Sequence, residues 1–476
     1  MAVAFAFDAM AHRGIIHSAG VRGRHSEARH VPIHPIVYQP EPYAFPDALY
    51  VIAYVVFFAG SALVTMRRPI WGAALLVLIQ PFALYGNVIH TTITLPKVGL
   101  VGVLLGLATF PHALSLASGK AFRSILLAGA LVLTATMLTT VAAVHHGPVL
   151  RESLKMAEYL LLFIAIRVAY ALDPDMRIVR AACIAVAIVV SALALSQEIL
   201  GAPSGLWING HQTPRIAGPL EGPNQLAGYF DIMIPLLLAL VIVTPDIFSS
   251  AALVLTVFAD SLTFSRAGLL AASAGILIVL YVLRSKPMKH AIACIAAGGI
   301  MGVSVVLGWA YVVHSTEIFR ITGGLRGTTE VSYAGGVGTR SQLWHAALTL
   351  WKRHPLLGVG AGNFELEIPL TGIRGVRTHA NSLYLQSLVE GGIPLFAATL
   401  WLTYVSIATF ARDRLRSPFV LAAFAGSIAI ALHQIVDLLV FYPKVGGWWW
   451  IVLALGAAQL AGTQPAREPA REPACV

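Results

Sequence analysis

The sequence contains very little charge for its length. Of its 476 residues, 57% are hydrophobic and only 11% are charged, whereas an average soluble domain has roughly 45–50% and about 25%. A water-soluble fold has no use for so much apolar surface, so the expected solvent is a lipid bilayer. The scarcity of charge therefore excludes an ordinary soluble enzyme and predicts an integral membrane protein.

Cysteine is scarce as well, with three residues in the whole chain. Cys183 and Cys294 lie in apolar runs and Cys475 lies in the C-terminal tail. This spacing is neither that of paired cysteines nor that of a metal site. We predict no disulfide framework and no cysteine-based metal centre.

The first 39 residues lack the basic, apolar and small-residue order of a signal peptide. They combine a short apolar start with four arginines and several irregularly spaced histidines. A histidine-biased tract can bind metal, but the irregular spacing favours a polar, disordered tail over residues 1–43. The repeated Ala-Arg-Glu-Pro near the other end predicts a second disordered tail over residues 463–476.

Apolar runs of about 18–25 residues recur between the two tails, and each is long enough to cross a hydrocarbon core of roughly 30 Å as a helix. They predict an all-α fold: a polytopic transmembrane helical bundle of about 12–13 spans in a single membrane domain, residues 44–462. The predicted spans are 44–65, 69–86, 98–117, 122–143, 153–171, 178–200, 225–244, 247–264, 266–283, 290–313, 385–411, 417–441 and 446–462.

The net charge of +10 raises the question of nucleic acid as a partner. The basic residues are spread over short loops, which favours positive-inside topology and anionic phosphate ligands instead. Two short basic loops, 284–289 and 412–416, predict the cytoplasmic side. Alternation then puts 211–224 and 314–380 outside, and Arg67-Arg68, the Lys120/Arg123 loop and 173–177 inside. Thirteen spans leave the N-terminal tail outside, unless one span is re-entrant or split.

The loop from His314 to Ala380 is the only large segment predicted outside the membrane. Loops longer than about 12–15 residues are usually functional or disordered. Apolar residues recur at helical spacing from Ser341 to Arg353, which predicts an amphipathic helix on the membrane surface or over a cavity. The glycine-rich stretch from Pro355 to Phe364 lacks the Gly-Lys-Ser/Thr of a nucleotide loop, so we predict a tight turn behind that helix.

Three polar residues at the outer ends of predicted helices are candidates for chemistry. Arg266 opens a span, where an arginine either anchors to lipid head groups or holds a phosphate through its planar fork. Arg340 starts the loop helix, where backbone amides favour anions, although it is equally explained as a solvated surface arginine. His379, where the loop re-enters the membrane, is suited either to accepting a proton near neutral pH or to a structural hydrogen bond.

Four segments, in this order along the chain, resemble the O-antigen ligase and polymerase superfamily of inner-membrane proteins. They are Ala217 to Ala227, Leu262 to Gly268, Thr339 to Trp344 with Pro355 to Phe364, and His379 to Pro394. The ligase-related region spans about residues 200–410. The resemblance implies a GT-C-like membrane enzyme without a cofactor or metal, which moves a glycan from undecaprenyl pyrophosphate to an acceptor hydroxyl with inversion.

The same resemblance implies roles for individual residues. In the family, two arginines contact the pyrophosphate and a histidine acts at the acceptor, which gives Arg266, Arg340 and His379 here as catalytic residues. Substrate-binding residues follow as Arg215, Asn224, Asn381 and Tyr384. Asn381 occupies the family's usual histidine position, with His379 two residues earlier, so either residue is a candidate for the acceptor side.

The implied partners are the lipid-linked donor, the bilayer and an acceptor, which is lipid A-core for a ligase or the growing glycan for a polymerase. The product would be lipopolysaccharide or exopolysaccharide, made at the periplasmic face of the bacterial inner membrane. The alternative is a transporter or flippase of lipid-linked sugars. It is motivated by ionisable residues within or near apolar runs, namely Lys155, Glu158, Arg167, Asp231, Asp260 and Asp437. A membrane scaffold is a third possibility, but it gives the long loop no role.

Overall fold

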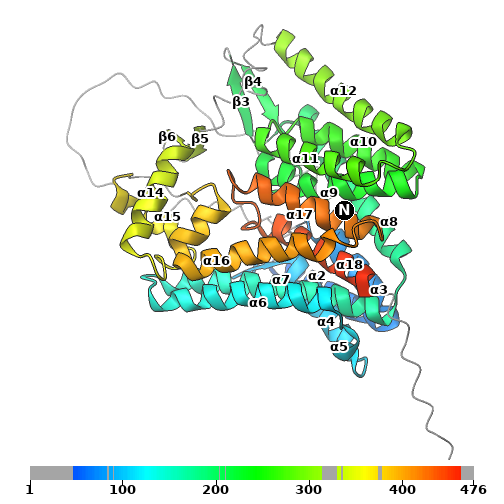
Figure 1. Cartoon of the computed structure of the whole chain (residues 1–476), viewed down its shortest axis with the longest axis horizontal. Helices are drawn as coiled ribbons and strands as arrows, with labels where there is room; N and C mark the ends of the chain where they lie inside the picture. Colours follow the sequence, from blue (N-terminus) through cyan, green and yellow to red (C-terminus); the bar gives the residue numbers. More distant parts are fainter. Residues whose placement is uncertain are drawn as a thin grey trace, which may run out of the picture.

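The structure is a computed structural model, and it describes residues 47–82, 85–88, 91–202, 204–208, 211–312, 330–333, 336–373 and 378–461. Both predicted tails lie outside these residues. Within them the chain forms a bundle of helices, so the predicted all-α class is confirmed (Figure 1). Five helical segments are apolar and long enough to cross a membrane: Lys120–Val141, Met176–Leu200, Pro223–Val243, Lys289–Val312 and Leu383–Ala411.

Each predicted span has one helix in the described part of the chain. The thirteen helices are α2 (Asp47–Arg67), α3 (Pro69–Ile79), α4 (Leu95–Ala108), α6 (Lys120–Leu138), α7 (His146–Leu172), α8 (Met176–Leu200), α9 (Pro223–Val243), α10 (Ile247–Ser261), α11 (Arg266–Val282), α12 (Lys289–Val312), α16 (Leu383–Ala411), α17 (Pro418–His433) and α18 (Pro443–Ala461). The predicted loop helix is also present, as α14 (Arg340–Arg353).

Three predicted spans end earlier than expected. The helix predicted over 69–86 ends at Ile79, shortly before Pro81, because proline donates no backbone hydrogen bond and clashes with the preceding turn. The helix predicted over 98–117 is interrupted near Pro111, and a short α5 (Ala113–Leu116) follows. The span predicted over 417–441 ends at His433, and residues 434–442 form a non-helical segment before α18.

Three two-stranded antiparallel hairpins, which the sequence did not predict, connect helices of the bundle. They are β1 (Tyr85–Val88) with β2 (Thr91–Thr94), β3 (Ser204–Ile208) with β4 (His211–Arg215), and β5 (Glu330–Tyr333) with β6 (Gly336–Thr339). The second hairpin leads into α9 and the third leads into α14. The second and third hairpins thus lead into helices that carry a candidate site residue in their first turn, Asn224 in α9 and Arg340 in α14.

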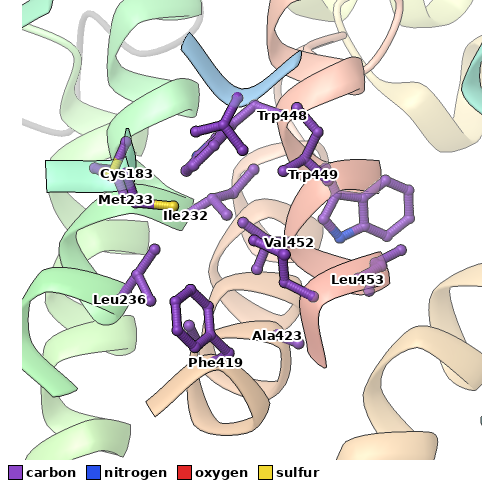
Figure 2. Packing of buried hydrophobic residues seen from close by; sticks show 14 of the residues in the cluster. Cys183, Ile232, Met233, Leu236, Phe419, Ala423, Trp448, Trp449, Val452 and Leu453 are labelled. Carbon is purple, nitrogen blue, oxygen red and sulfur yellow. The ribbon is translucent and has the colours of Figure 1, made fainter. Parts of the chain in front are cut away.

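The core of the bundle is built around α9 and α18. Every residue of α9 from Leu226 to Ile242 is buried, as are the residues of α18 from Lys444 to Ala458. Figure 2 shows side chains of α9, α17 and α18 packed together, including Trp448 and Phe419. A helix that is apolar on all sides needs protein or lipid around it, and α9 is surrounded by protein.

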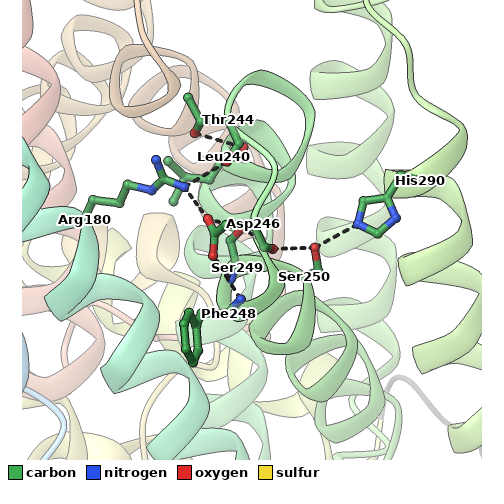
Figure 3. A network of polar contacts seen from close by, with 8 residues as sticks. All are labelled: Arg180, Leu240, Thr244, Asp246, Phe248, Ser249, Ser250 and His290. Atoms are coloured by element: carbon green, nitrogen blue, oxygen red, sulfur yellow. Dashed lines mark hydrogen bonds and ion pairs between the residues drawn. The ribbon is translucent and has the colours of Figure 1, made fainter.

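Polar contacts join the loops at one end of the bundle. Arg68 forms an ion pair with Asp173 at 3.0 Å. Arg180 pairs with Asp246, and Ser250 hydrogen-bonds to His290 at 2.8 Å (Figure 3). These contacts bring together the loops between α2 and α3, α7 and α8, α9 and α10, and α11 and α12, which chain alternation places on one side.

The extramembrane elements α14 and α15 (Phe364–Glu367) lie together with β5 and β6 at one end of the bundle, on the left in Figure 1, whereas α5 lies at the opposite end. The inner face of α14 is apolar, and Leu343, Ala346, Ala347 and Leu350 are buried. Part of this face packs with Val359, Phe364 and Val389. The loop helix is therefore docked onto the end of α16.

Candidate functional site

The segment of residues 434–442 carries a buried carboxylate, Asp437, which two candidate residues contact. The Nδ2 of Asn224, in the first turn of α9, donates to Asp437 Oδ2 at 2.8 Å. The Nη2 of Arg340, at the start of α14, lies 3.8 Å from the same oxygen. The side chains of Arg340 and Asp437 are only 13% and 6% exposed, so this is a partly desolvated ion pair.

A second arginine reaches this group from the β3–β4 hairpin. The Nη2 of Arg215 donates to Asn224 Oδ1 at 3.2 Å, and its Nε donates to the carbonyl of Thr263 at 3.0 Å. Burial lowers the pKa of Arg215 to about 10, the charge of Asp437 opposes this shift, and the charges of Arg266 and Arg340 add to it. Arg215 is therefore close enough to feel the charges of Asp437 and of two other arginines, which come from two further elements.

The turn between α10 and α11 positions the third arginine. Phe264 has a left-handed backbone, with φ of 52°, which is costly for a bulky residue and marks a turn held in place by its surroundings. Ser265 follows as the N-cap of α11, and its hydroxyl accepts from the amide of Gly268 at 3.3 Å. Arg266 is thus fixed as the first residue of α11, where the helix dipole favours an anion.

The segment of residues 434–442 packs inside the bundle, against α7. Its carbonyls at Phe441 and Val440 accept hydrogen bonds from Lys155 Nζ at 2.9 Å and from the Tyr159 hydroxyl at 3.0 Å. Lys155 lies nine residues after His146, where α7 begins, or roughly 13 Å along the helix axis. The site is therefore recessed below the end of α7, and side chains satisfy its irregular backbone, as membrane depth requires.

His379 lies against the same segment. Its ring centroid is 4.3 Å from that of Phe441 and 6.4 Å from that of Tyr442. Burial, followed by the charges of Lys155 and Arg151, lowers the pKa of His379 to about 4. The imidazole is thus neutral at physiological pH, the protonation state that a proton acceptor needs.

Asn381 and Tyr384 are engaged within the protein. Asn381 has a left-handed backbone with φ of 49°, and its Nδ2 donates to the carbonyl of His379 at 3.2 Å. In an extended segment, side chains two residues apart point to the same face. The left-handed conformation of Asn381 breaks this rule, so the side chains of His379 and Asn381 need not point the same way. The Tyr384 hydroxyl donates to the carbonyl of Ala431 at 3.0 Å, which ties α16 to α17.

The predicted glycine-rich turn packs against a break in α16. The amides of Val359 and Gly360 donate to the carbonyls of Val389 and Glu390 at 2.9 Å each. Gly392 has φ of 60° and interrupts α16, and a Cβ at this position would lie 2.2 Å from the carbonyl oxygen of Leu356. Gly392 therefore permits the close approach of the two backbones, which fixes the loop helix on the bundle.

An open cavity of about 290 Å³ lies beside Arg340. It is lined by residues of α14 and of the short segment after α15, namely Ser341, Gln342, His345, Ala346, Thr371 and Ile373. Most of the exposed lining is apolar, and Ser341, Gln342, His345 and Thr371 add hydroxyl, amide and imidazole groups, which bind polar ligands through hydrogen bonds.

Four residues that sequence reasoning did not assign to the site belong to it by position. They are Asp437, Lys155, Tyr442 and Lys444, the last of which lies 3.6 Å from Glu221 and donates to the carbonyl of Pro219. Lys155 and Asp437 were singled out only as ionisable residues in or near apolar runs. That property was the available signal, because charge at membrane depth is expensive and is usually functional.

The comparison with curated proteins finds no match. The comparison with family models matches residues 251–400, or 150 of the 476, to the family described as O-Antigen ligase. This region contains Arg266, Arg340, His379 and the glycine-rich turn, whereas Arg215, Asn224 and Asp437 lie outside it. The predicted resemblance is confirmed for this region: residues 251–400 of the multi-pass membrane protein match the O-antigen ligase domain of the ligase and polymerase superfamily of glycan-transferring enzymes.

Proposed function

We propose that this protein transfers a glycan from undecaprenyl pyrophosphate to an acceptor hydroxyl at the periplasmic face of the bacterial inner membrane. The observation that carries the proposal is that Arg215 and Arg340 lie near Asp437 at one end of the bundle, with Arg266 close enough for its charge to act on Arg215. Three cations next to one carboxylate leave a net positive charge, which is complementary to a pyrophosphate.

In the proposed reaction the acceptor oxygen attacks the anomeric carbon, and the bond from that carbon to the pyrophosphate oxygen breaks. Attack from the opposite face gives inversion. The lipid pyrophosphate leaves as an anion that Arg266 and Arg340 stabilise, so that their charge takes the part a metal ion plays elsewhere. The acceptor proton passes to the neutral imidazole of His379.

The orientation in the membrane rests on basic residues at the end opposite the site. The linked loops at that end contain Arg68, Arg284, Lys286 and Lys289, and short basic loops favour the cytoplasm. The arginine cluster then faces the periplasm. The open cavity beside Arg340, with a few polar groups in its mostly apolar lining, gives room for sugar residues of the donor or the acceptor.

The test is transfer by purified protein supplied with undecaprenyl-linked repeat units, with and without lipid A-core. Longer lipid-linked chains would indicate a polymerase, and transfer to the core would indicate a ligase. Arg266→Ala and Arg340→Ala should lose most activity. Lys352→Ala, which removes an exposed basic residue from the other end of α14, is the matched control and should retain it.

The same preparation separates this function from the transporter alternative. Reconstituted vesicles that move lipid-linked sugars across the bilayer, without forming any glycosidic bond, would contradict the proposal. Bond formation that is lost with Arg340 and kept in the Lys352 variant would support it.

A further inference from the structure

Lys155 is a buried cation that the proposed reaction leaves without a role. It lies within α7, and its Nζ is 2.6 Å from Glu152 Oε2, 2.9 Å from the carbonyl oxygen of Phe441 and 3.6 Å from the centre of the Phe441 ring. The side chains of Lys155 and Glu152 are 14% and 12% exposed. Burying such a pair is expensive unless its geometry is good, and here three partners converge on one ammonium group.

Phe441 links this pair to the candidate base. The same ring that lies under Lys155 lies 4.3 Å, centre to centre, from the imidazole of His379. Among the described residues, the imidazole nitrogens of His379 have no hydrogen-bond partner. The position of the imidazole therefore depends on ring packing, and the position of Phe441 depends on Lys155.

We propose that Lys155 is a positioning residue for His379: it holds Phe441 against the imidazole and keeps a positive charge beside it, which Glu152 partly balances. The role in glycan transfer rests on the proposed function. The effect on the imidazole itself does not, so it can be measured without any substrate.

The charged groups that act on His379 directly are Lys155 and Arg151 of α7. Glu152 of α7 and Glu390 of α16 act on Lys155. Tyr442, whose ring faces His379, is acted on by Asp437, Glu221 and Glu365. Burial is the largest cause of the lowered pKa of His379, and Lys155 is the next. A cation disfavours a second positive charge nearby, so removal of Lys155 should raise the pKa of His379 from about 4 toward its ordinary value of 6.5.

The consequence for the reaction is a base that stays neutral across a wide pH range. A histidine at its ordinary pKa would be half protonated near pH 6.5 and would lose its capacity to accept a proton below that value. The cation beside Phe441 moves this loss to more acidic pH. His379 would then be ready to accept a proton over the whole range in which transfer is assayed.

The experiment measures acylation of His379 by diethyl pyrocarbonate, which attacks the neutral imidazole, in the full-length protein in detergent from pH 4.5 to 8. Modification is read peptide by peptide by mass spectrometry, which separates His379 from other histidines. The wild-type rate should be nearly constant over this range. In Lys155→Met the rate should fall at the acidic end, with a midpoint raised by on the order of one pH unit.

Glu152→Gln is the matched variant, because it breaks the same ion pair but keeps the positive charge, and its profile should stay as flat as that of the wild type. Lys120→Met, which removes an exposed lysine at the start of α6, should also stay flat. A flat profile in Lys155→Met would overturn the proposal. So would an equal acid fall in Glu152→Gln, since disturbed packing would then explain both variants.

Two further measurements complete the test. Phe441→Ala should raise the modification rate of His379 at pH 8 several-fold by uncovering the imidazole, and an unchanged rate would contradict the role of Phe441. Lys155→Arg should restore both the flat profile and most of the glycan transfer that Lys155→Met loses. Restoration of the profile without any transfer in the wild type would leave this inference standing and refute the proposed function.

Discussion

Arg340 differs from an ordinary surface arginine in its surroundings. Its side chain is 13% exposed and lies 3.8 Å from Asp437. Burial lowers the pKa of Arg340, and the charge of Asp437 offsets part of this lowering. A guanidinium carries several donors in a rigid plane and bridges two oxygens at once, whereas an ammonium is a point charge. At this position we therefore expect geometry to matter as much as charge.

Arg340→Lys should be nearly as damaging as Arg340→Ala. Loss of charge-assisted bonds in a desolvated transition state costs about 3–4 kcal/mol, or a rate factor of roughly 100–1000. The measurement is the glycan transfer rate at matched protein levels. Full activity in the lysine variant would mean that Arg340 is a surface residue without a part in the chemistry.

The glycan transfer rate also distinguishes the role of His379 from that of Asn381. His379→Ala and His379→Gln should both lose transfer by roughly 100–10,000-fold, because glutamine keeps hydrogen bonding and lacks a basic nitrogen. Asn381→Ala should lose less, since its amide bonds locally to the carbonyl of His379. Near-normal rates in both His379 variants would mark the histidine as structural.

The pH dependence of these variants has a definite sign. A pKa of about 4 leaves the His379 imidazole neutral from pH 5 to 8, so the wild type should show no acid loss from this group over that range. Acidification below pH 5 should protonate it and reduce transfer. A steep fall between pH 7 and 6 would instead point to a different titrating group.

At the scale of elements, the contact between the glycine-rich turn and the break in α16 connects the loop helix to the membrane helices. A Cβ at Gly392 would lie 2.2 Å from the carbonyl oxygen of Leu356, a backbone atom that cannot swing aside. The side chain of Glu390 accepts from the amide of Phe364 at 3.2 Å and from Gln386 at 2.7 Å. Packing and polar contacts thus act together at this junction.

Gly392→Ala should destabilise the protein. The backbone of Gly392, with φ of 60° and ψ of −156°, is a conformation that essentially only glycine adopts; it costs another residue roughly 1–3 kcal/mol, and the clash adds to that. The measurement is the thermal unfolding midpoint in detergent, which should fall, together with weaker transfer as α14 shifts. Gly299→Ala on α12 is the control, because a Cβ there meets nothing within 4 Å; equal midpoints in the two variants would contradict the close approach.

At the scale of the whole molecule, the bundle has two chemically different ends. One carries the short basic loops joined by Arg68–Asp173 and Arg180–Asp246, and the other carries the arginine cluster with α14. The positive-inside rule predicts that the basic end faces the cytoplasm, and we propose on that basis that the other end faces the periplasm. The proposed active site depends on this orientation, because a lipid-linked glycan that has already been exported is reached only from outside.

Single cysteines test the orientation directly, in a background where Cys475 is replaced and the buried Cys183 and Cys294 are kept. A cysteine at Lys352 should react with a membrane-impermeant thiol reagent added to the periplasmic side. Cysteines at Lys286 and Arg412 should react only after the membrane is opened. The reverse pattern would remove the periplasmic site.

Hydropathy and motif order were enough to predict the class of the molecule. In a bilayer, apolar runs long enough to cross it can form only helices. The thirteen runs therefore predicted thirteen helices, with the long polar loop between the tenth and the eleventh. The amphipathic period from Ser341 to Arg353 predicted α14 to within one residue. The motifs predicted the family, because each one is a short local stretch and their order can be read directly from the sequence.

Which residues come into contact could be read from the fold but not from the sequence. Residues 434–442 are as apolar as a span, so hydropathy alone extended a helix through Asp437, whereas hydrogen bonds from Lys155, Tyr159 and the Leu383 amide hold them as a buried loop. Arg340 and Asp437 lie far along the chain from each other and from the pair Arg215 and Asn224, and no periodic pattern relates them. Their meeting follows from the packing of α9, α14 and α17, since long-range contacts depend on how whole helices fit together.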